Sequence, residues 1–115
     1  MAVDVCRALQ IVCVASGAPS LQALKRAAVS EAWELTVGAT DAEDALQQIG
    51  HRGAHVLVTW GSFDDLVTQA RQRFPHLRII AVGRKPVVGA DVNLTSITGV
   101  RDAILGIPPP GGPVR

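Results

Sequence analysis

The feature that most constrains this chain is a series of short, nearly continuous apolar runs separated by segments with helical periodicity. The runs at residues 9–15, 54–60 and 78–82 are nearly continuous, the segment 33–37 alternates weakly, and 92–94 is a short fifth one. Such β-branched runs are typical of strands that are covered on both faces, as in a parallel sheet. Helical segments between parallel strands form right-handed crossovers. The sequence therefore predicts an α/β domain in three layers, with a five-stranded parallel sheet between helices.

The segments between the apolar runs carry signals for the two ends of a helix. The predicted N-terminal caps are Ser20, Thr40 and Ser62, whose hydroxyls can accept a hydrogen bond from the first helical turn. Glu43 gives the second of these helices the spacing of a capping box. The predicted stop signals are Gly50, Gly53 and Pro75. A last helix is expected to begin at Ser96 or Thr98.

The segment 83–91 departs from this alternation of strands and helices. It must connect two neighbouring strands in nine residues, whereas a crossover that contains a helix usually needs at least ~10–12 residues. Pro86 and Gly89 further oppose a helix. We therefore expect the fourth crossover helix to be absent or reduced to a turn, with Val87 and Val88 replacing its apolar cover.

Length and composition limit the possible functions. A chain of 115 residues is long enough for one domain, expected at 1–107 and followed by a Pro/Gly-rich tail or linker at 108–115. The net charge of +1 and the scarcity of aromatic residues argue against a general nucleic-acid or membrane-surface binder. No apolar run is long enough to span a bilayer. A cytoplasmic protein is expected.

Two stretches near the N-terminus have an enzymatic or ligand-binding interpretation beside a structural one. Cys13–Gly17 resembles the loop of sugar-phosphotransferase IIB domains, although Cys13 lies one residue too early and a buried core cysteine is favoured. Ser16–Ser20 could cradle a phosphate at a helix start, although it lacks the P-loop lysine. The alternative function is therefore a small-ligand or phosphate-binding domain, or a IIB-like enzyme, that uses the loops after 9–15 and 54–60.

The order and spacing of the predicted elements resemble those of a response-regulator receiver domain, from the first strand to the last helix. The most specific matches are Ala39–Leu46, which is similar to the start of the receiver's second helix, and Gly89–Leu94, which is similar to the run before its conserved lysine. The resemblance implies a flavodoxin-like sheet with strand order 2-1-3-4-5.

The residues that a receiver needs for phosphorylation are missing at the matching positions. Ala15 and Ser16 stand where receivers have the acidic pair that holds Mg²⁺. Trp60 replaces the acceptor aspartate, Gly83 the switch serine or threonine, and Ser96 the lysine. The chain therefore resembles an atypical receiver, or pseudo-receiver. We expect no aspartyl-phosphate chemistry, no enzymatic activity, no metal and no cofactor.

These observations predict a protein-interaction module in signalling or assembly. The resemblance also suggests a setting as the N-terminal domain of a MinD-like ATPase of pilus-assembly or septum-site type. A protein partner or a second copy of the chain is expected to bind, and nucleic acid and membrane are not. The candidate interaction residues are Trp60, Arg84, Lys85, Val87 and Val88, because partly exposed tryptophan is common at interface hot spots and uncovered apolar residues usually mark an interface.

Overall fold

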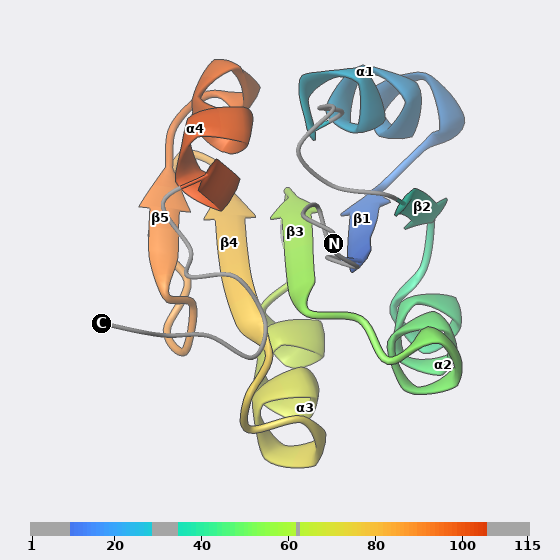
Figure 1. Ribbon diagram of the computed structural model, residues 1–115. Coiled ribbons are helices and arrows are strands. Elements are labelled where there is room, and N and C mark those ends of the chain that lie inside the picture. The colour runs from blue at the N-terminus through green and yellow to red at the C-terminus, as the bar shows by residue number, and fades with distance from the viewer. Residues whose placement is uncertain (1–9, 29–34, 62, 106–115) are drawn as a thin grey trace, which may run out of the picture.

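The chain folds into three layers, with one parallel sheet between two pairs of helices (Figure 1). The structure, a computed structural model, describes residues 10–28, 35–61 and 63–105. The strands are β1 (Gln10–Ala15), β2 (Leu35–Ala39), β3 (Val56–Trp60), β4 (Arg78–Val82) and β5 (Val92–Leu94). They pair in parallel in the order β2-β1-β3-β4-β5. The predicted fold class and strand order are confirmed.

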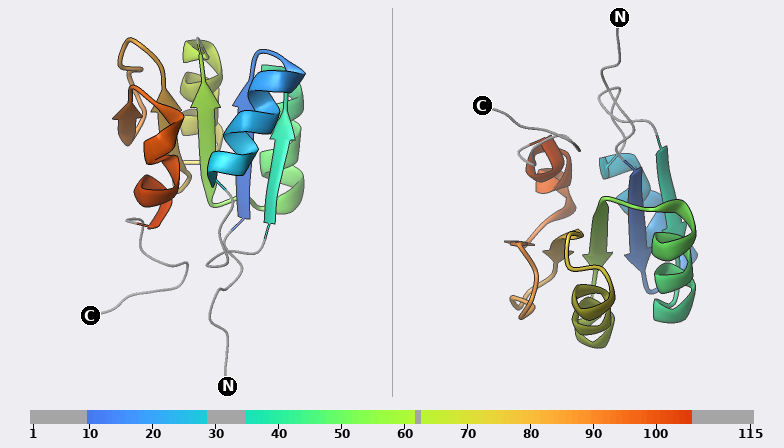
Figure 2. Two further views of the ribbon diagram at one scale, coloured as in Figure 1. Left: turned by 90° about the horizontal axis from the view of Figure 1, so that it is seen from above. Right: turned by 60° about the horizontal axis from the view of Figure 1, so that its bottom comes forward.

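The helices divide between the two faces of the sheet. They are α1 (Ala18–Ala28), α2 (Ala42–Arg52), α3 (Asp64–Arg73) and α4 (Val100–Leu105), with a single 3-10 turn, η1 (Ile97–Gly99), before α4. Helices α1 and α4 cover one face, and α2 and α3 cover the other, as Figures 1 and 2 show. Within the described ranges, no helix is long and apolar enough to cross a membrane.

The first two predicted caps are wrong, by three residues for α1 and by one for α2. Ser20 lies inside α1, because that helix already begins at Ala18. Asp41 caps α2 in place of Thr40, and its carboxylate accepts a hydrogen bond from the Asp44 N–H at 2.8 Å. An aspartate at this position satisfies an N–H group that the helix leaves free, so it serves as well as a threonine.

The other end signals are mostly confirmed. Gly53 ends α2 in the left-handed conformation at φ 66°, whereas Gly50 lies within the helix. Helix α3 ends before Pro75, and its N-cap residue, Phe63, has no side-chain hydrogen bond to the helix. Ser96 caps η1 by accepting the Thr98 N–H. The predicted cap Ser62, the boundary at 107 and the tail lie outside the described residues.

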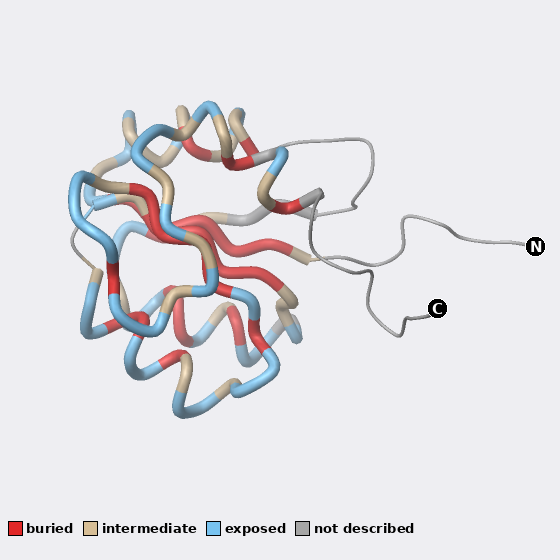
Figure 3. The backbone as a smooth tube through the Cα atoms, turned by 90° about the vertical axis from the view of Figure 1, so that its left-hand side faces the viewer, coloured by how far each residue is buried: buried red, intermediate tan, exposed pale blue. Residues whose placement is uncertain are grey.

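The core consists of two apolar clusters, one on each face of the sheet. Alternate residues of the central strands enter opposite clusters, so Val12 and Leu57 pack towards α2 and α3 while Cys13 and Val58 pack towards α1 and α4. Figure 3 shows this buried centre as continuous red segments inside an exposed outer layer. Burial on both faces explains why the central strands are nearly continuous apolar runs.

The segment Gly83–Asp91 contains no helix, as predicted. Its two valines differ in the structure. Val87 is buried with 7% of its surface exposed and joins the cluster beneath α2 and α3, whereas Val88 is 90% exposed. Of the two valines, only Val87 therefore replaces the cover of the missing helix. The expectation that Val88 would share this task is wrong, because the turn at Val88 and Gly89 directs it to solvent.

Candidate functional site

The carboxyl ends of the strands meet at one edge of the sheet. Ala15 of β1, Trp60 of β3 and Val82 of β4 are paired in one row, and Leu94 of β5 continues it. Ala15 and Trp60, two of the positions that the receiver resemblance singled out, lie in this row, and Gly83 directly follows Val82. Ala15 is fully buried and Ser16 follows it, so the end of β1 presents no carboxylate to solvent. In open α/β sheets this edge is where ligands usually bind.

A pocket of about 510 Å³ opens at this edge between the loops that follow β3 and β4. We call it the β3–β4 pocket. Its lining residues are Trp60, Gly61, Asp64, Gly83, Arg84, Lys85, Pro86 and Val87. Four of the five predicted interaction residues thus lie around one hollow, and Val88 is not part of it. Whether these residues bind a partner stays a prediction.

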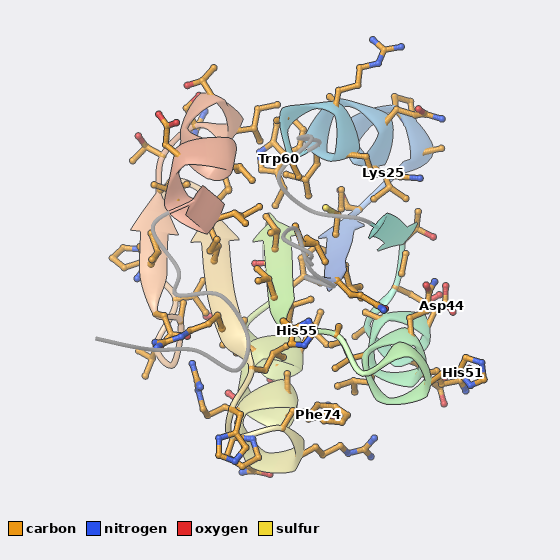
Figure 4. The ribbon with its side chains drawn as sticks, viewed as in Figure 1. Lys25, Asp44, His51, His55, Trp60 and Phe74 are labelled. Atoms are coloured by element: carbon orange, nitrogen blue, oxygen red, sulfur yellow. The ribbon has the colours of Figure 1, made fainter. Side chains whose placement is uncertain are left out.

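Trp60 closes the end of β3 on the face that α1 and α4 cover. It is half-buried and packs against the apolar cluster of that face, and Figure 4 shows it between the ends of β3 and α1. The chain then turns at Gly61, whose φ of 115° is unfavourable for a residue with a side chain. The Gly61 N–H donates to the Val82 carbonyl at 3.0 Å, which joins the two loops of the pocket.

The loop after β4 is held by the sheet at several points. The Gly83 N–H donates to the Leu94 carbonyl at 2.9 Å. The Val87 N–H donates to Oδ1 of Asn93 at 2.7 Å, so a polar side chain on β5 fixes the backbone where Val87 enters the core. Arg84, Lys85 and Pro86 lie between these two anchors and are exposed. The pocket wall is therefore a short span with fixed ends.

Arg71 of α3 fixes the far end of the same loop. Its Nη2 donates to the Gly89 carbonyl at 2.9 Å and to Oδ2 of Asp91 at 2.8 Å. Its Nη1 donates to the Leu77 carbonyl at 3.0 Å. One planar guanidinium thus joins α3, the residue before β4 and the end of the loop, a geometry that a lysine could not reproduce.

Asp91 is the charged partner in this network. Burial raises the pKa of its carboxyl group, but the hydrogen bond from the Ile79 N–H and the charges of Arg71 and Arg78 outweigh burial and hold the pKa below its usual range. The carboxylate therefore stays ionised at neutral pH and maintains its ion pair with Arg71. The sequence showed no sign of this network, because a salt bridge across twenty positions has no local signal.

The two cations of the pocket have no partner of their own. Within the part of the chain that the structure describes, Arg84 and Lys85 form no ion pair and no hydrogen bond. Asp64, the first residue of α3, is the acidic residue that lines the same pocket. The charged groups of the lining therefore carry a net single positive charge, from two cations and one carboxylate.

Cys13 has the structural role that its position predicts. It is fully buried in β1, and burial raises the pKa of its thiol to about 12, with a smaller opposing effect from Lys25. A thiol that is neutral and hidden at physiological pH is a poor nucleophile. The core interpretation of Cys13 is therefore supported, and the IIB-like alternative loses its nucleophile.

No metal site is evident among the described residues, where no group of three His, Cys, Asp or Glu side chains converges. His55 is engaged by the backbone, since its Nδ1 accepts the Gln10 N–H at 3.1 Å. A second hollow, of about 620 Å³, lies along α2 and is lined by Asp44, Gln47, Gln48 and His51. Figure 4 shows Asp44 and His51 on the outer, right-hand side of α2. This hollow lacks the apolar and cationic groups of the β3–β4 pocket.

The sequence did not predict Gly61, Asp64, Gly83 or Pro86 as part of a shared site. The available signal was topological, because loops that follow adjacent parallel strands lie side by side at the carboxyl edge. The alternative function, a ligand-binding domain or IIB-like enzyme, was predicted to use a different pair of loops, those after β1 and β3. The structure places the hollow between the loops after β3 and β4 instead.

Comparisons with known proteins show which fold this is. A scan against protein-family models gave no match, and a search of curated proteins found no relative. Among solved structures, a CheY-like response-regulator receiver domain protein from Methanospirillum hungatei JF-1 is similar at a TM-score of 0.70 and 16% identity, over 85% of this chain and 91% of that one. The isolated REC domain of RcsB from Salmonella enterica serovar Typhimurium is similar at 0.69 and 18% identity, over 86% and 87% of the two chains. This chain has the flavodoxin-like fold of response-regulator receiver domains.

A similar fold also occurs in a protein of a different kind. A cobalamin-binding protein from Desulfitobacterium hafniense DCB-2 is similar at a TM-score of 0.65 and 16% identity, over 88% of this chain and 59% of that one. At such identities the likeness concerns the fold alone. Function has to be argued from the residues of the site.

Proposed function

We propose that this chain is a non-phosphorylatable receiver-like module that acts in signalling or assembly by contacting another protein. The observation that carries the proposal is the row of strand ends at the carboxyl edge. Ala15, Trp60 and Gly83 stand there in place of groups that could bind Mg²⁺, accept a phosphoryl group or sense it. None of these residues supplies the oxygen ligands that Mg²⁺ prefers.

The contact surface that we propose is the loop after β4 with its pocket. Arg84 and Lys85 are exposed and form no ion pair within the described residues. Val88 is a large apolar residue with 90% of its surface exposed. An exposed apolar residue with charged neighbours fits the apolar centre and polar rim of a protein interface. The occupant is a protein partner or a second copy of this chain.

The Pro/Gly-rich segment 108–115 supports a further part of the proposal. A segment of this composition is suited to connecting two domains. We therefore propose that the module acts as the N-terminal domain of a longer protein, such as a MinD-like ATPase of pilus-assembly or septum-site type. Expression of the natural gene product and measurement of its mass would test this directly.

The phosphorylation part is tested with acetyl phosphate and Mg²⁺, followed by intact-mass spectrometry. We expect no mass increase of one phosphoryl group. A receiver with an intact acidic pair serves as the positive control in the same reaction. A phosphoryl group mapped to any aspartate of this chain would contradict the proposal.

The contact part is tested with Val88→Asp and Arg84→Glu, made separately. Self-association is measured by light scattering, and partner binding by co-purification followed by pull-down with the identified partner. Val88→Asp should abolish binding, while circular dichroism shows that the fold persists. If both variants bind like the wild type, the loop after β4 is not the interface.

A further inference from the structure

We propose that the β3–β4 pocket receives a carboxylate side chain from an acidic segment of the partner protein. The inference rests on the proposed function and adds the chemistry of the partner and the place where its anchor residue lies. Its basis is the combination of a hollow of about 510 Å³, two cations without partners and a wall held by hydrogen bonds at both ends.

Charge determines which kind of segment fits. Arg84 and Lys85 are adjacent in sequence and line the same hollow, so a side chain that enters it meets both cations. Neither is neutralised by an ion pair within the described ranges. The planar guanidinium of an arginine and the ammonium group of a lysine can both donate hydrogen bonds to a carboxylate. Here this requires little free energy, because neither cation has to give up an internal contact first.

The shape of the pocket favours one protruding side chain with an apolar stem. Pro86 and the half-buried Trp60 contribute apolar surface to the lining, and the glycines at 61 and 83 leave the loop backbones uncovered. A Cβ built on Gly83 would meet no atom closer than the Gly61 carbonyl oxygen at 4.0 Å. The hollow therefore has room for a side chain such as glutamate, with its methylene groups against the apolar part.

The wall of the pocket is already in place before a partner arrives. Asn93 fixes Val87, and Arg71 fixes Gly89 and Asp91, so the loop is held on both sides of Val88. Preorganisation lowers the entropy that binding would otherwise cost. A short acidic segment can therefore be recognised without reorganisation of the loop.

Asp64 provides a test of whether the bound segment is acidic or basic. It is the carboxylate in the lining, and it opposes an incoming anion. If an acidic segment binds, Asp64→Asn should tighten binding by about two- to threefold, while Arg84→Glu weakens it by about three- to tenfold. A basic segment would produce the opposite pair of effects.

The experiment selects random linear peptides displayed on phage against the full chain, and then measures the affinity of the recovered peptides by fluorescence anisotropy. We expect acidic sequences to be enriched, and their affinity to fall as salt rises. Gly83→Leu, which fills the pocket at a position with no positive φ, should weaken binding more than tenfold. Arg73→Glu is the matched control for Arg84→Glu. It makes the same charge change at the C-terminal end of α3, away from Asp64 and the pocket, and should leave binding nearly unchanged.

The outcomes separate this inference from the proposed function. If binding of the identified partner is lost in Val88→Asp but kept in Gly83→Leu, contact through the loop survives and the pocket inference is overturned. Enrichment of basic or uncharged peptides, or tighter binding to Arg84→Glu, also overturns it. If Gly83→Leu misfolds by circular dichroism, the opposite responses of Asp64→Asn and Arg84→Glu still decide the question.

Discussion

Thr59 is predicted to weaken the fold, so that replacing it with valine should stabilise the protein. Its side chain is fully buried near the end of β3, between Val14 and Ala81 of the neighbouring strands. Its hydroxyl oxygen has no hydrogen-bond partner. A hydroxyl taken from water without a partner costs ~1–3 kcal/mol. Valine has nearly the same shape and keeps the β-branched form that strands favour.

The expected gain in the free energy of unfolding for Thr59→Val is therefore about 1–3 kcal/mol. For a chain of this length, each kcal/mol corresponds to roughly 4 °C, so the melting temperature should rise by about 4–12 °C. Urea titration followed by circular dichroism measures the free energy, and calorimetry measures the melting temperature. An unchanged slope of the urea curve would show that the gain reflects stability and not a changed unfolded state.

Thr68→Val is the matched control for this experiment. Thr68 lies on the exposed face of α3, where its hydroxyl donates to the Asp64 carbonyl at 3.1 Å. The same chemical change there should alter stability by less than about 0.5 kcal/mol. If Thr59→Val is no more stable than the wild type, the Thr59 hydroxyl has a partner in solution and the reasoning is wrong.

Three further predictions follow from the core and the loop anchors. Leu57→Ala should cost about 2–5 kcal/mol by leaving a cavity in the sheet, whereas the exposed-face change Gln47→Ala should cost well under ~1 kcal/mol; equal losses in urea would contradict the assignment of both residues. Because the pKa of Asp91 is lowered in the folded protein, its ion pair with Arg71 contributes stability above the ordinary aspartate pKa of 3.8, and that contribution is lost as pH falls through the folded pKa. Urea midpoints of wild type and Asp91→Asn should therefore differ at neutral pH and converge in acid; a constant difference would refute the ion-pair explanation. Iodoacetamide should label Cys13 only after unfolding, as peptide mass spectrometry would show, since its thiol is buried with a pKa raised to about 12.

The sequence alone determined the fold class and the missing crossover helix. A strand in the middle of a parallel sheet is buried on both faces, so most of its residues are apolar, and runs such as 79–82 indicate it without any knowledge of neighbours. The segment 83–91 is too short and too rich in helix-breaking residues for a helix, which is also a local property.

Helix starts were less predictable, because several residue types can cap a helix. Asp41 and Thr40 are adjacent and both can accept the hydrogen bond, so only the backbone conformation chose Asp41. The extended φ and ψ of Asp41, at −140° and 162°, place its carboxylate over the first turn.

The tertiary structure alone decided which predicted residues share a site. Trp60 and the pair Arg84 and Lys85 are more than twenty positions apart, and they meet because β3 and β4 are parallel neighbours whose carboxyl ends coincide. Val87 is buried and Val88 is exposed. The hydrogen bond from the Val87 N–H to Asn93 fixes the backbone so that the Val87 side chain enters the core while that of Val88 stays in solvent. Contacts of this kind join residues by geometry and not by sequence distance, so no local pattern records them.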